Sequence, residues 1–279
     1  MPSAESAPPG SSPGVALPDR GRLFRWLLAG VVLLAWGALW AWSLSPWSGY
    51  LAHDRWSDLG QLAAWCRAIP QGEWLLPALG HAGAWLLMVA AMMLPTIYPL
   101  LRLFSRMVAS RADAGALLTR LVLGYLLAWF GFGLLAHGMD AGLHGFAARS
   151  DWMFRQGWAL GPLVLGGAGL FQFSALKYRC LDRCRSPLGF ITQHWHGREP
   201  RREALRLGLA HGLFCVGCCW ALMLLMFVVG TGNPGWMLAI GAAMAAEKNL
   251  PWGRHLSAPL GLTLLATAGA LALAGPSPG

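Results

Sequence analysis

Long apolar segments recur along the chain, and they restrict its fold more than any other feature. Most of them are long enough to cross the ~30 Å hydrocarbon core of a bilayer as helices. Hydrophobic residues make up 56% of the chain and charged residues 12%, which excludes an ordinary soluble domain. We therefore expect an all-α, polytopic transmembrane helix bundle of about seven helices, or six if the shortest segment does not span. The predicted helices cover 24–44, 78–101, 121–139, 158–176, 205–229, 236–246 and 256–273.

The N-terminal part of the chain precedes this bundle. Residues 1–20 are rich in Pro, Ser and Gly and poor in large apolar side chains, which predicts a disordered tail. Residues 21–279 are predicted to form a single transmembrane domain. Segment 24–44 lacks a convincing Ala-x-Ala cleavage site and is interpreted as an anchor. Residues 45–77 combine Trp with acidic residues, a composition typical of a loop at the membrane interface.

Basic residues are distributed very unevenly between the two sides of such a bundle. Counted over the loops, 17 of the 21 Lys and Arg residues fall on the side of the N-terminus, and 4 fall on the other. Because positively charged loops stay in the cytoplasm, the N-terminus is predicted to be cytoplasmic. The same distribution explains the net charge of +9 without a nucleic-acid partner. The lipid bilayer is the partner expected for the helices.

Segment 205–229 holds an unusual set of polar and sulfur-containing side chains. On a helical wheel His211, Cys215 and Cys218 lie within roughly 60° of one another. Met226 lies on the same side, with Cys219 and Met223 on its flank. Imidazole, thiolate and thioether groups are ligands for Cu(I), Zn(II) or a related soft ion. The alternative is that small Cys and adaptable Met side chains only pack well inside a bundle.

Segment 78–101 carries a second stripe of the same kind. His81, Met88 and Met92 lie within roughly 40° on a helical wheel, and Met93 follows. Pro95 is predicted to break the helix and to turn Met92 and Met93 toward the bundle. Packing of Met side chains beside one buried His remains the alternative to a ligand role.

A third group of candidate ligands lies in the loop after segment 158–176. Cys180 and Cys184, at spacing i, i+4, would share one face of a continuation of that helix. The loop joins consecutive helices, so these thiols are predicted to meet Cys215 and Cys218 at the cytoplasmic side and to ligate one ion or a small cluster with them. Surrounding cations are expected to lower the thiol pKa values. These cations are Lys177, Arg179, Arg183 and Arg185.

Four motifs resemble the bacterial DUF2182 family, whose members are described as predicted metal-binding integral membrane proteins. The motifs are Trp85 to Met93-Leu94-Pro95, Leu176-Lys177-x2-Cys180-Leu181-x2-Cys184-Arg185-x-Pro187-x2-Phe190, His211-Gly212-x2-Cys215-x-Gly217-Cys218-Cys219-Trp220, and Glu247-Lys248-x2-Pro251-x-Gly253. The resemblance implies a bacterial inner membrane location. It also implies metal-ligand candidates at Cys180, Cys184, His211, Cys215, Cys218 and Cys219.

The leading hypothesis is a soft-metal handling protein of metal homeostasis, with copper(I) favoured and zinc possible. It would bind the ion at the cytoplasmic Cys/His cluster and pass it along the Met stripes, in transport or in delivery to a partner protein. The basic loop at 177–206 is the expected docking surface for a metal donor or acceptor. The alternative is a membrane redox enzyme or subunit that uses the thiols, or a cofactor such as haem held by His81, His137 and His211. No ATP-binding, HExxH or serine-hydrolase motif is present in the sequence, and no catalytic residue is assigned.

Overall fold

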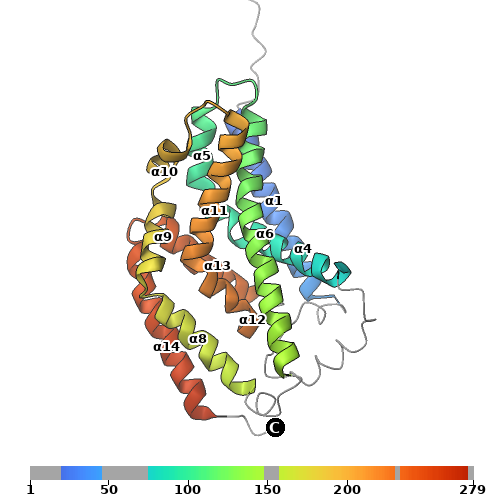
Figure 1. Ribbon diagram of the computed structural model, residues 1–279, viewed down its shortest axis with the longest axis vertical. Coiled ribbons are helices and arrows are strands. Elements are labelled where there is room, and N and C mark those ends of the chain that lie inside the picture. Colours follow the sequence, from blue (N-terminus) through green and yellow to red (C-terminus); the bar gives the residue numbers. More distant parts are fainter. Residues whose placement is uncertain (1–19, 46–74, 148–156, 230–232, 276–279) are drawn as a thin grey trace, which may run out of the picture.

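The computed structural model describes residues 20–45, 75–147, 157–229 and 233–275, and every regular element within these ranges is helical (Figure 1). The predicted all-α class is therefore confirmed. The α-helices are α1 (Arg20–Ser43), α4 (Leu75–Met92), α5 (Tyr98–Met107), α6 (Ala114–Ala147), α8 (Leu160–Phe171), α9 (Ala175–Arg185), α10 (Pro187–His194), α11 (Pro200–Leu224), α12 (Met226–Val229), α13 (Pro234–Asn249) and α14 (Ser257–Ala274). Short 3-10 segments are η2 (Leu94–Ile97), η3 (Gly157–Ala159) and η4 (Gly253–Leu256). The predicted tail up to residue 19, and most of the predicted interface loop, lie outside the described residues.

The helices are apolar and long enough to make this a multi-pass membrane protein. Within the described ranges, four helices are long and apolar enough to cross a bilayer, and α4 with η2 and α5 makes a fifth if that bent pair is one span. Each of the seven predicted segments forms helix, but not every one is a candidate span. Helix α8 has 12 residues and α13 has 16, so neither reaches the length of a full crossing by itself.

Helices α6 and α11 form the most extensive helix pair among the described elements, and glycines bring their backbones together. A Cβ atom at Gly208 would lie 1.9 Å from the carbonyl oxygen of Leu121, and one at Gly124 would lie 2.1 Å from that of Leu205. No side chain fits at either position. Small residues at a helix interface allow this close approach, and the pair fixes the position of the Cys-rich face of α11.

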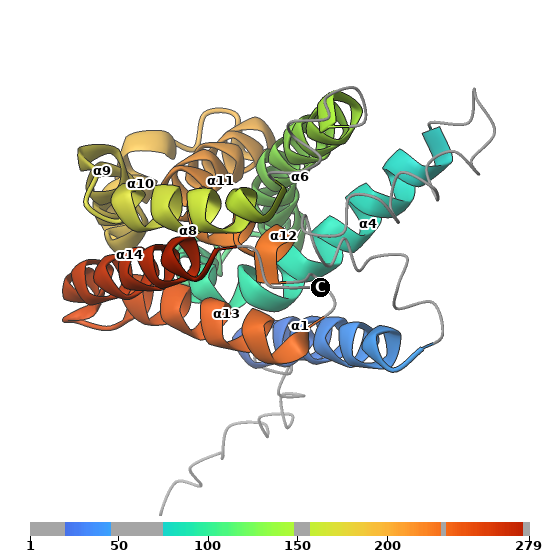
Figure 2. The same cartoon turned by 90° about the horizontal axis from the view of Figure 1, so that it is seen from below.

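A second tight pair, α8 and α14, covers one side of the bundle (Figure 2). A Cβ atom at Gly169 would lie 2.8 Å from Cγ of Leu265, and one at Gly261 would lie 2.6 Å from the ring of Phe173. These glycines therefore let the two helices pack in contact along their lengths. Of the glycines in segment 158–176, Gly169 is the one whose position leaves no room for a side chain.

The helix predicted over 78–101 is broken, as Pro95 predicts. Helix α4 ends at Met92, the 3-10 segment η2 follows, and α5 continues at an angle of 48° to α4. Proline has no amide hydrogen and cannot continue the helical hydrogen-bond pattern. Met92 and Met93 are both buried, so the prediction that they face the bundle is confirmed. The break places the backbone and the thioether of Met93 at the centre of the molecule.

The helix predicted over 158–176 also breaks, which the sequence analysis did not predict. Helix α8 ends at Phe171, and α9 begins at Ala175 after a turn. The hydroxyl of Ser174 accepts a hydrogen bond of 3.1 Å from the backbone N–H of Lys177 and caps the new helix. Cys180 and Cys184 therefore lie on a separate helix and not on a continuation of the preceding one.

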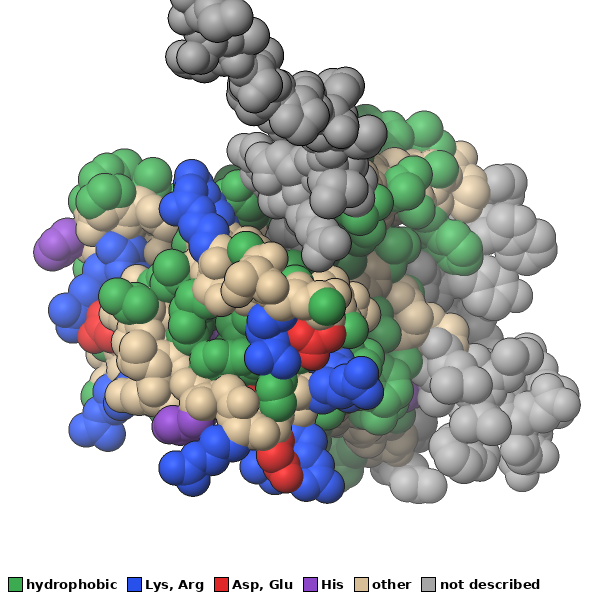
Figure 3. All heavy atoms as spheres, turned by 90° about the horizontal axis from the view of Figure 1, so that it is seen from above, with side chains coloured by type: hydrophobic (Ala, Val, Ile, Leu, Met, Phe, Trp, Pro, Cys, Tyr) green, Lys and Arg blue, Asp and Glu red, His purple; other side chains and the backbone are tan. Residues whose placement is uncertain are grey.

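Basic side chains gather at one end of the molecule (Figure 3). This end carries the connection between α5 and α6 and the start of α11, which lie side by side (Figure 1). They line a common shallow pocket with both signs of charge. Its lining residues are Arg111, Asp113, Glu199, Pro200, Arg201 and Arg202. The α5–α6 connection and the start of α11, which the charge pattern assigns to one side of the membrane, thus lie at the same end of the bundle, whereas Lys177 and Lys248 are buried inside it.

Candidate metal centre

The centre of the bundle contains three sulfur atoms from two elements. Cys215 and Cys219 lie one turn apart on α11, and Met93 comes from the break between α4 and η2. The Cys219 Sγ atom lies 3.8 Å from the Met93 Sδ atom. All three side chains are at most 1% exposed. The two thiols of α11 and the thioether at the end of α4 thus form a buried group of soft donor atoms.

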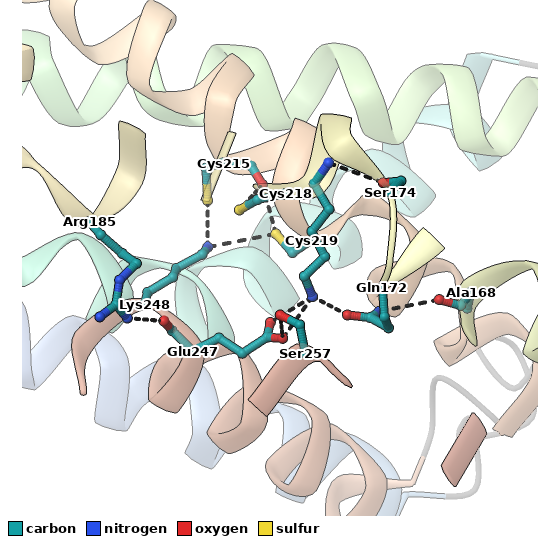
Figure 4. A network of polar contacts seen from close by, with 11 residues as sticks. Ala168, Gln172, Ser174, Arg185, Cys215, Cys218, Cys219, Glu247, Lys248 and Ser257 are labelled. Atoms are coloured by element: carbon teal, nitrogen blue, oxygen red, sulfur yellow. Dashed lines mark hydrogen bonds and ion pairs between the residues drawn. The ribbon is translucent and has the colours of Figure 1, made fainter. Parts of the chain in front are cut away.

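The ammonium group of Lys248 lies against these three sulfur atoms, and Figure 4 shows its contacts with Cys215 and Cys219. Its Nζ atom is 2.9 Å from Cys215 Sγ, 3.7 Å from Cys219 Sγ and 3.7 Å from Met93 Sδ. Lys248 belongs to the last turn of α13 and is 7% exposed. A buried cation is thus surrounded by two thiols and a thioether. We call Met93, Cys215, Cys219 and Lys248 the central cluster.

Tyr125 of α6 closes the central cluster from a further side. Its hydroxyl oxygen lies 3.1 Å from Cys215 Sγ and donates a hydrogen bond of 3.4 Å to the backbone carbonyl of Met93. The side chain is fully buried. Tyr125 therefore fixes the position of the Cys215 sulfur relative to the break in α4.

A second group of thiols lies between α9 and α11. Cys184 Sγ is 4.0 Å from Cys218 Sγ, and Cys184 is half-buried. Cys180 packs against the backbone of Gly217, where an added Cβ atom would lie 2.6 Å from the Cys180 sulfur. We call Cys180, Cys184 and Cys218 the outer thiols. The five cysteines of the described ranges are all free thiols.

His211 lies one turn before Cys215 on α11 and is 2% exposed. Its ring packs edge-on against Phe190 at a centroid distance of 5.1 Å. Its Nδ1 atom is buried and has no hydrogen-bond partner among the described residues. A buried ring nitrogen without a partner is costly, and such a group in a native structure calls for an explanation.

A family model described as PpoB2, copper chaperone, matches residues 82–271, which is more than half of the chain. The chain belongs to the PpoB2 copper chaperone family. No curated protein and no solved structure gives a significant match. The match supports the broad expectation of copper handling in a membrane protein, in agreement with the resemblance of the motifs to DUF2182 proteins.

The donor atoms present fit the copper that this family handles. Thiolates and thioethers are soft ligands that suit Cu(I), and thiolates also bind Zn(II). Among the described residues, no three His, Cys, Asp or Glu side chains converge on one point. The central cluster adds a Met sulfur to two thiols, which makes three soft donors for an ion that needs no fourth ligand. Two thiols of the predicted four-thiol set, Cys184 and Cys218, lie 4.0 Å apart, and the binding of one ion by all four thiols stays a prediction.

The basic residues near the outer thiols do not act on them as expected. Lys177 was predicted to lower thiol pKa values, but its Nζ atom pairs with the Glu247 carboxylate at 2.7 and 2.9 Å. Arg185 donates to the backbone carbonyls of Glu247 and Pro251. The pKa of the Cys180 thiol is raised, because the side chain is buried and Cys218 lies near it. The prediction that the surrounding cations lower the pKa of this thiol is therefore wrong.

The remaining candidate ligands are placed as follows. Met92 packs beside Gly241 of α13, and Met223 and Met226 of the stripe in segment 205–229 are fully buried. Among the Met side chains of the two stripes, only Met93 contacts the Lys248 ammonium in the contacts described. His81 lies in α4, but its side chain is outside the described part of the structure. A ligand role for these four residues stays a prediction.

Two members of the arrangement were missed by the sequence analysis. Tyr125 is one of many aromatic residues in an apolar segment and gave no signal. Lys248 carried a signal, because the pair Glu247-Lys248 ends an apolar helix and forms part of a motif. A charged side chain in an apolar helix usually has a functional partner, and for Lys248 the partners are sulfur atoms.

Proposed function

We propose that this protein binds Cu(I) in the central cluster and delivers it to an acceptor protein. The observation that carries the proposal is the placement of Cys215 Sγ, Cys219 Sγ and Met93 Sδ within 3.7 Å of one buried cation, the Lys248 ammonium. These sulfur atoms already enclose a positive charge. A Cu(I) ion bound by the same atoms would take the central place, with Lys248 shifted beside it.

The number and type of donors favour copper over zinc. A structural Zn(II) site takes four ligands in a tetrahedron, commonly from Cys and His. The central cluster offers two thiols and one thioether, and a thioether is a poor Zn(II) ligand. Cu(I) accepts such a low-coordinate sulfur environment. Copper(I) is therefore the proposed cargo, and zinc is the ion to exclude by experiment.

The outer thiols are proposed to exchange copper with the central cluster. Cys218 donates a hydrogen bond of 3.1 Å to the Cys215 carbonyl, so the two groups adjoin along α11. Cys184 is half-buried and gives the outer thiols a more accessible end. Copper moves between proteins by ligand exchange, and a second thiol group next to a buried one supplies the intermediate ligands. His211, one turn from Cys215, is a further candidate ligand for this exchange.

The basic end of the bundle is proposed to face the cytoplasm of a bacterial inner membrane. The support is the excess of Lys and Arg in the loops that lie together at this end. The start of α11 also belongs to this end, and Cys215 lies roughly 22 Å further along the helix. Donor or acceptor proteins are proposed to dock on the basic region at 177–206.

The redox alternative rests on the separation of 4.0 Å between Cys184 Sγ and Cys218 Sγ. Two thiols this close are candidates for a reversible disulfide, although disulfide formation also depends on the Cβ directions. In that case the outer thiols would cycle while the central cluster stays reduced. Titration of free thiols before and after oxidation by glutathione disulfide would measure such a couple.

The direct test is the amount of Cu(I) bound per protein under anaerobic, reducing conditions. We expect the purified full chain to lose its tightest Cu(I) site in Cys215→Ser and in Cys219→Ser, and to weaken strongly in Met93→Leu. Cys180→Ser is the matched control, because it removes a buried thiol outside the central cluster. Loss in Cys180→Ser and Cys215→Ser, with copper retained in Cys219→Ser and Met93→Leu, would favour the set of Cys180, Cys184, Cys215 and Cys218 predicted from the sequence. Equal copper in all four and in the wild type would overturn the proposal.

A further inference from the structure

We propose that Lys248 makes the central cluster selective for a monovalent ion over a divalent one. The juxtaposition that carries this inference is a buried ammonium group 2.9 Å from one thiol and 3.7 Å from a second. The inference rests on the proposed function, since it concerns the same site. It assigns to Lys248 the role of a counter-charge beside the ligands and not that of a ligand.

The charge of Lys248 is not neutralised by the acidic residue beside it. Both carboxylate oxygens of Glu247 accept hydrogen bonds from Lys177, and one also accepts from Ser257. Every hydrogen-bond partner that the described residues give to the Lys248 Nζ atom is a sulfur atom. The Lys248 ammonium therefore has thiol and thioether sulfur atoms, and no carboxylate, as its hydrogen-bond partners among the described residues.

The net charge of the occupied site differs between a monovalent and a divalent cargo ion. Two thiolates, the Lys248 ammonium and Cu(I) together carry no net charge. The same groups with Zn(II) or another divalent ion carry one excess positive charge in a dry interior, where an uncompensated charge is costly. Silver(I) has the charge of Cu(I) and prefers the same soft ligands, so it belongs with the accepted ions.

Removal of the ammonium group reverses this balance. Without it, two thiolates with Cu(I) keep one negative charge, and two thiolates with Zn(II) are neutral. The ratio of the two dissociation constants should therefore shift toward Zn(II) when Lys248 is neutral. For unit charges about 4 Å apart, with an effective dielectric constant between those of water and a protein interior, the shift should be at least about tenfold.

The experiment measures Cu(I) and Zn(II) dissociation constants on the full chain in detergent, each with a colour-changing competitor chelator specific for that ion. The test variants are Lys248→Leu and Lys248→Gln, so that the test does not depend on one side chain that packs badly. Lys248→Arg keeps the charge. Arg102→Leu removes one positive charge from an exposed position of α5 and controls for net charge.

We expect the preference for Cu(I) over Zn(II) to fall at least about tenfold in the two neutral variants and to stay within about threefold of wild type in Lys248→Arg and Arg102→Leu. A ratio unchanged in the neutral variants would overturn the inference. An equal gain of affinity for both ions would also overturn it, because Lys248 would then only compete for the site. Cys215→Ser, measured in parallel, shows whether the central cluster binds copper at all. Failure of the proposed function would leave Cu(I) bound in this variant, whereas failure of the inference alone would not.

Discussion

Glu247 and Lys248 are adjacent on α13, yet their charges belong to separate networks (Figure 4). Glu247 accepts hydrogen bonds from Lys177 and Ser257, at 2.7 Å for the shortest contact of each. Lys248 lies 2.9 Å from the Cys215 sulfur. The first network joins α9, α13 and α14 into one unit, and the second connects that unit to the Cys-rich face of α11. Glu247 and Lys248 thus connect the unit formed by α9, α13 and α14 with the central cluster.

The Lys177–Glu247 ion pair gives the first prediction. Both side chains are at most 3% exposed, so removal of one partner leaves an uncompensated buried charge. We expect Lys177→Met to destabilise the protein by about 3–5 kcal/mol. The double variant Lys177→Met with Glu247→Gln should recover a large part of this loss. Thermal unfolding of the detergent-solubilised protein measures both, and equal melting temperatures for the single and double variants would contradict the prediction.

The close contact of α6 with α11 gives the second prediction. Gly124→Ala places a methyl group 2.1 Å from the Leu205 carbonyl oxygen and should separate the two helices, at a cost of about 1–3 kcal/mol or more. Gly131→Ala is the matched control on the same helix, because an added Cβ there meets nothing within 4 Å. Copper affinity should fall with Gly124→Ala and stay unchanged with Gly131→Ala. Similar unfolding temperatures for the two variants would show that α6 and α11 do not pack through this glycine.

The orientation of the bundle gives the third prediction. A fluorescent reporter fused after Pro200 should fold and fluoresce, and an alkaline phosphatase fused at the same point should be inactive, because the basic end faces the cytoplasm. The same pair of reporters fused after Ala147, at the other end of α6, should give the opposite result. Phosphatase activity after Pro200 would reverse the predicted topology.

The sequence predicted those features that depend on local chemistry. The length of the apolar segments predicted the positions of the helices. Pro95 predicted the helix break at which Met93 joins the central cluster. The break before α9 was missed, because Gln172-Phe173-Ser174 has neither Pro nor Gly to signal it. The structure shows that Gln172 is buried and accepts a hydrogen bond from Lys177, a contact that forms only when the turn is made.

The composition of the central cluster could not be predicted for a different reason. Cys215 and Lys248 are 33 residues apart in sequence and meet because α13 packs back against the middle of the bundle. The helical wheel of α11 placed Cys219 on the flank of its stripe. The structure places the Cys219 sulfur 3.8 Å from the sulfur of Met93, at the break that follows α4. Such contacts are set by the packing of one helix on another, and the periodicity of a single segment does not predict them.

The last prediction concerns His211. The buried Nδ1 atom of His211 lacks a partner in the described structure, and the residue precedes Cys215 by one helical turn. If this nitrogen receives copper on its way to Cys215, His211→Ala should lower the rate of copper loading and reduce affinity about tenfold, whereas His211→Cys should retain most of both because a soft ligand survives. His194→Ala is the control, since the Nδ1 atom of His194 already lies 2.9 Å from the Phe190 carbonyl oxygen. Stopped-flow transfer of Cu(I) from a chelator to the purified protein measures the rate. Equal loading rates for His211→Ala and wild type, at unchanged unfolding temperature, would assign His211 to packing against Phe190 alone.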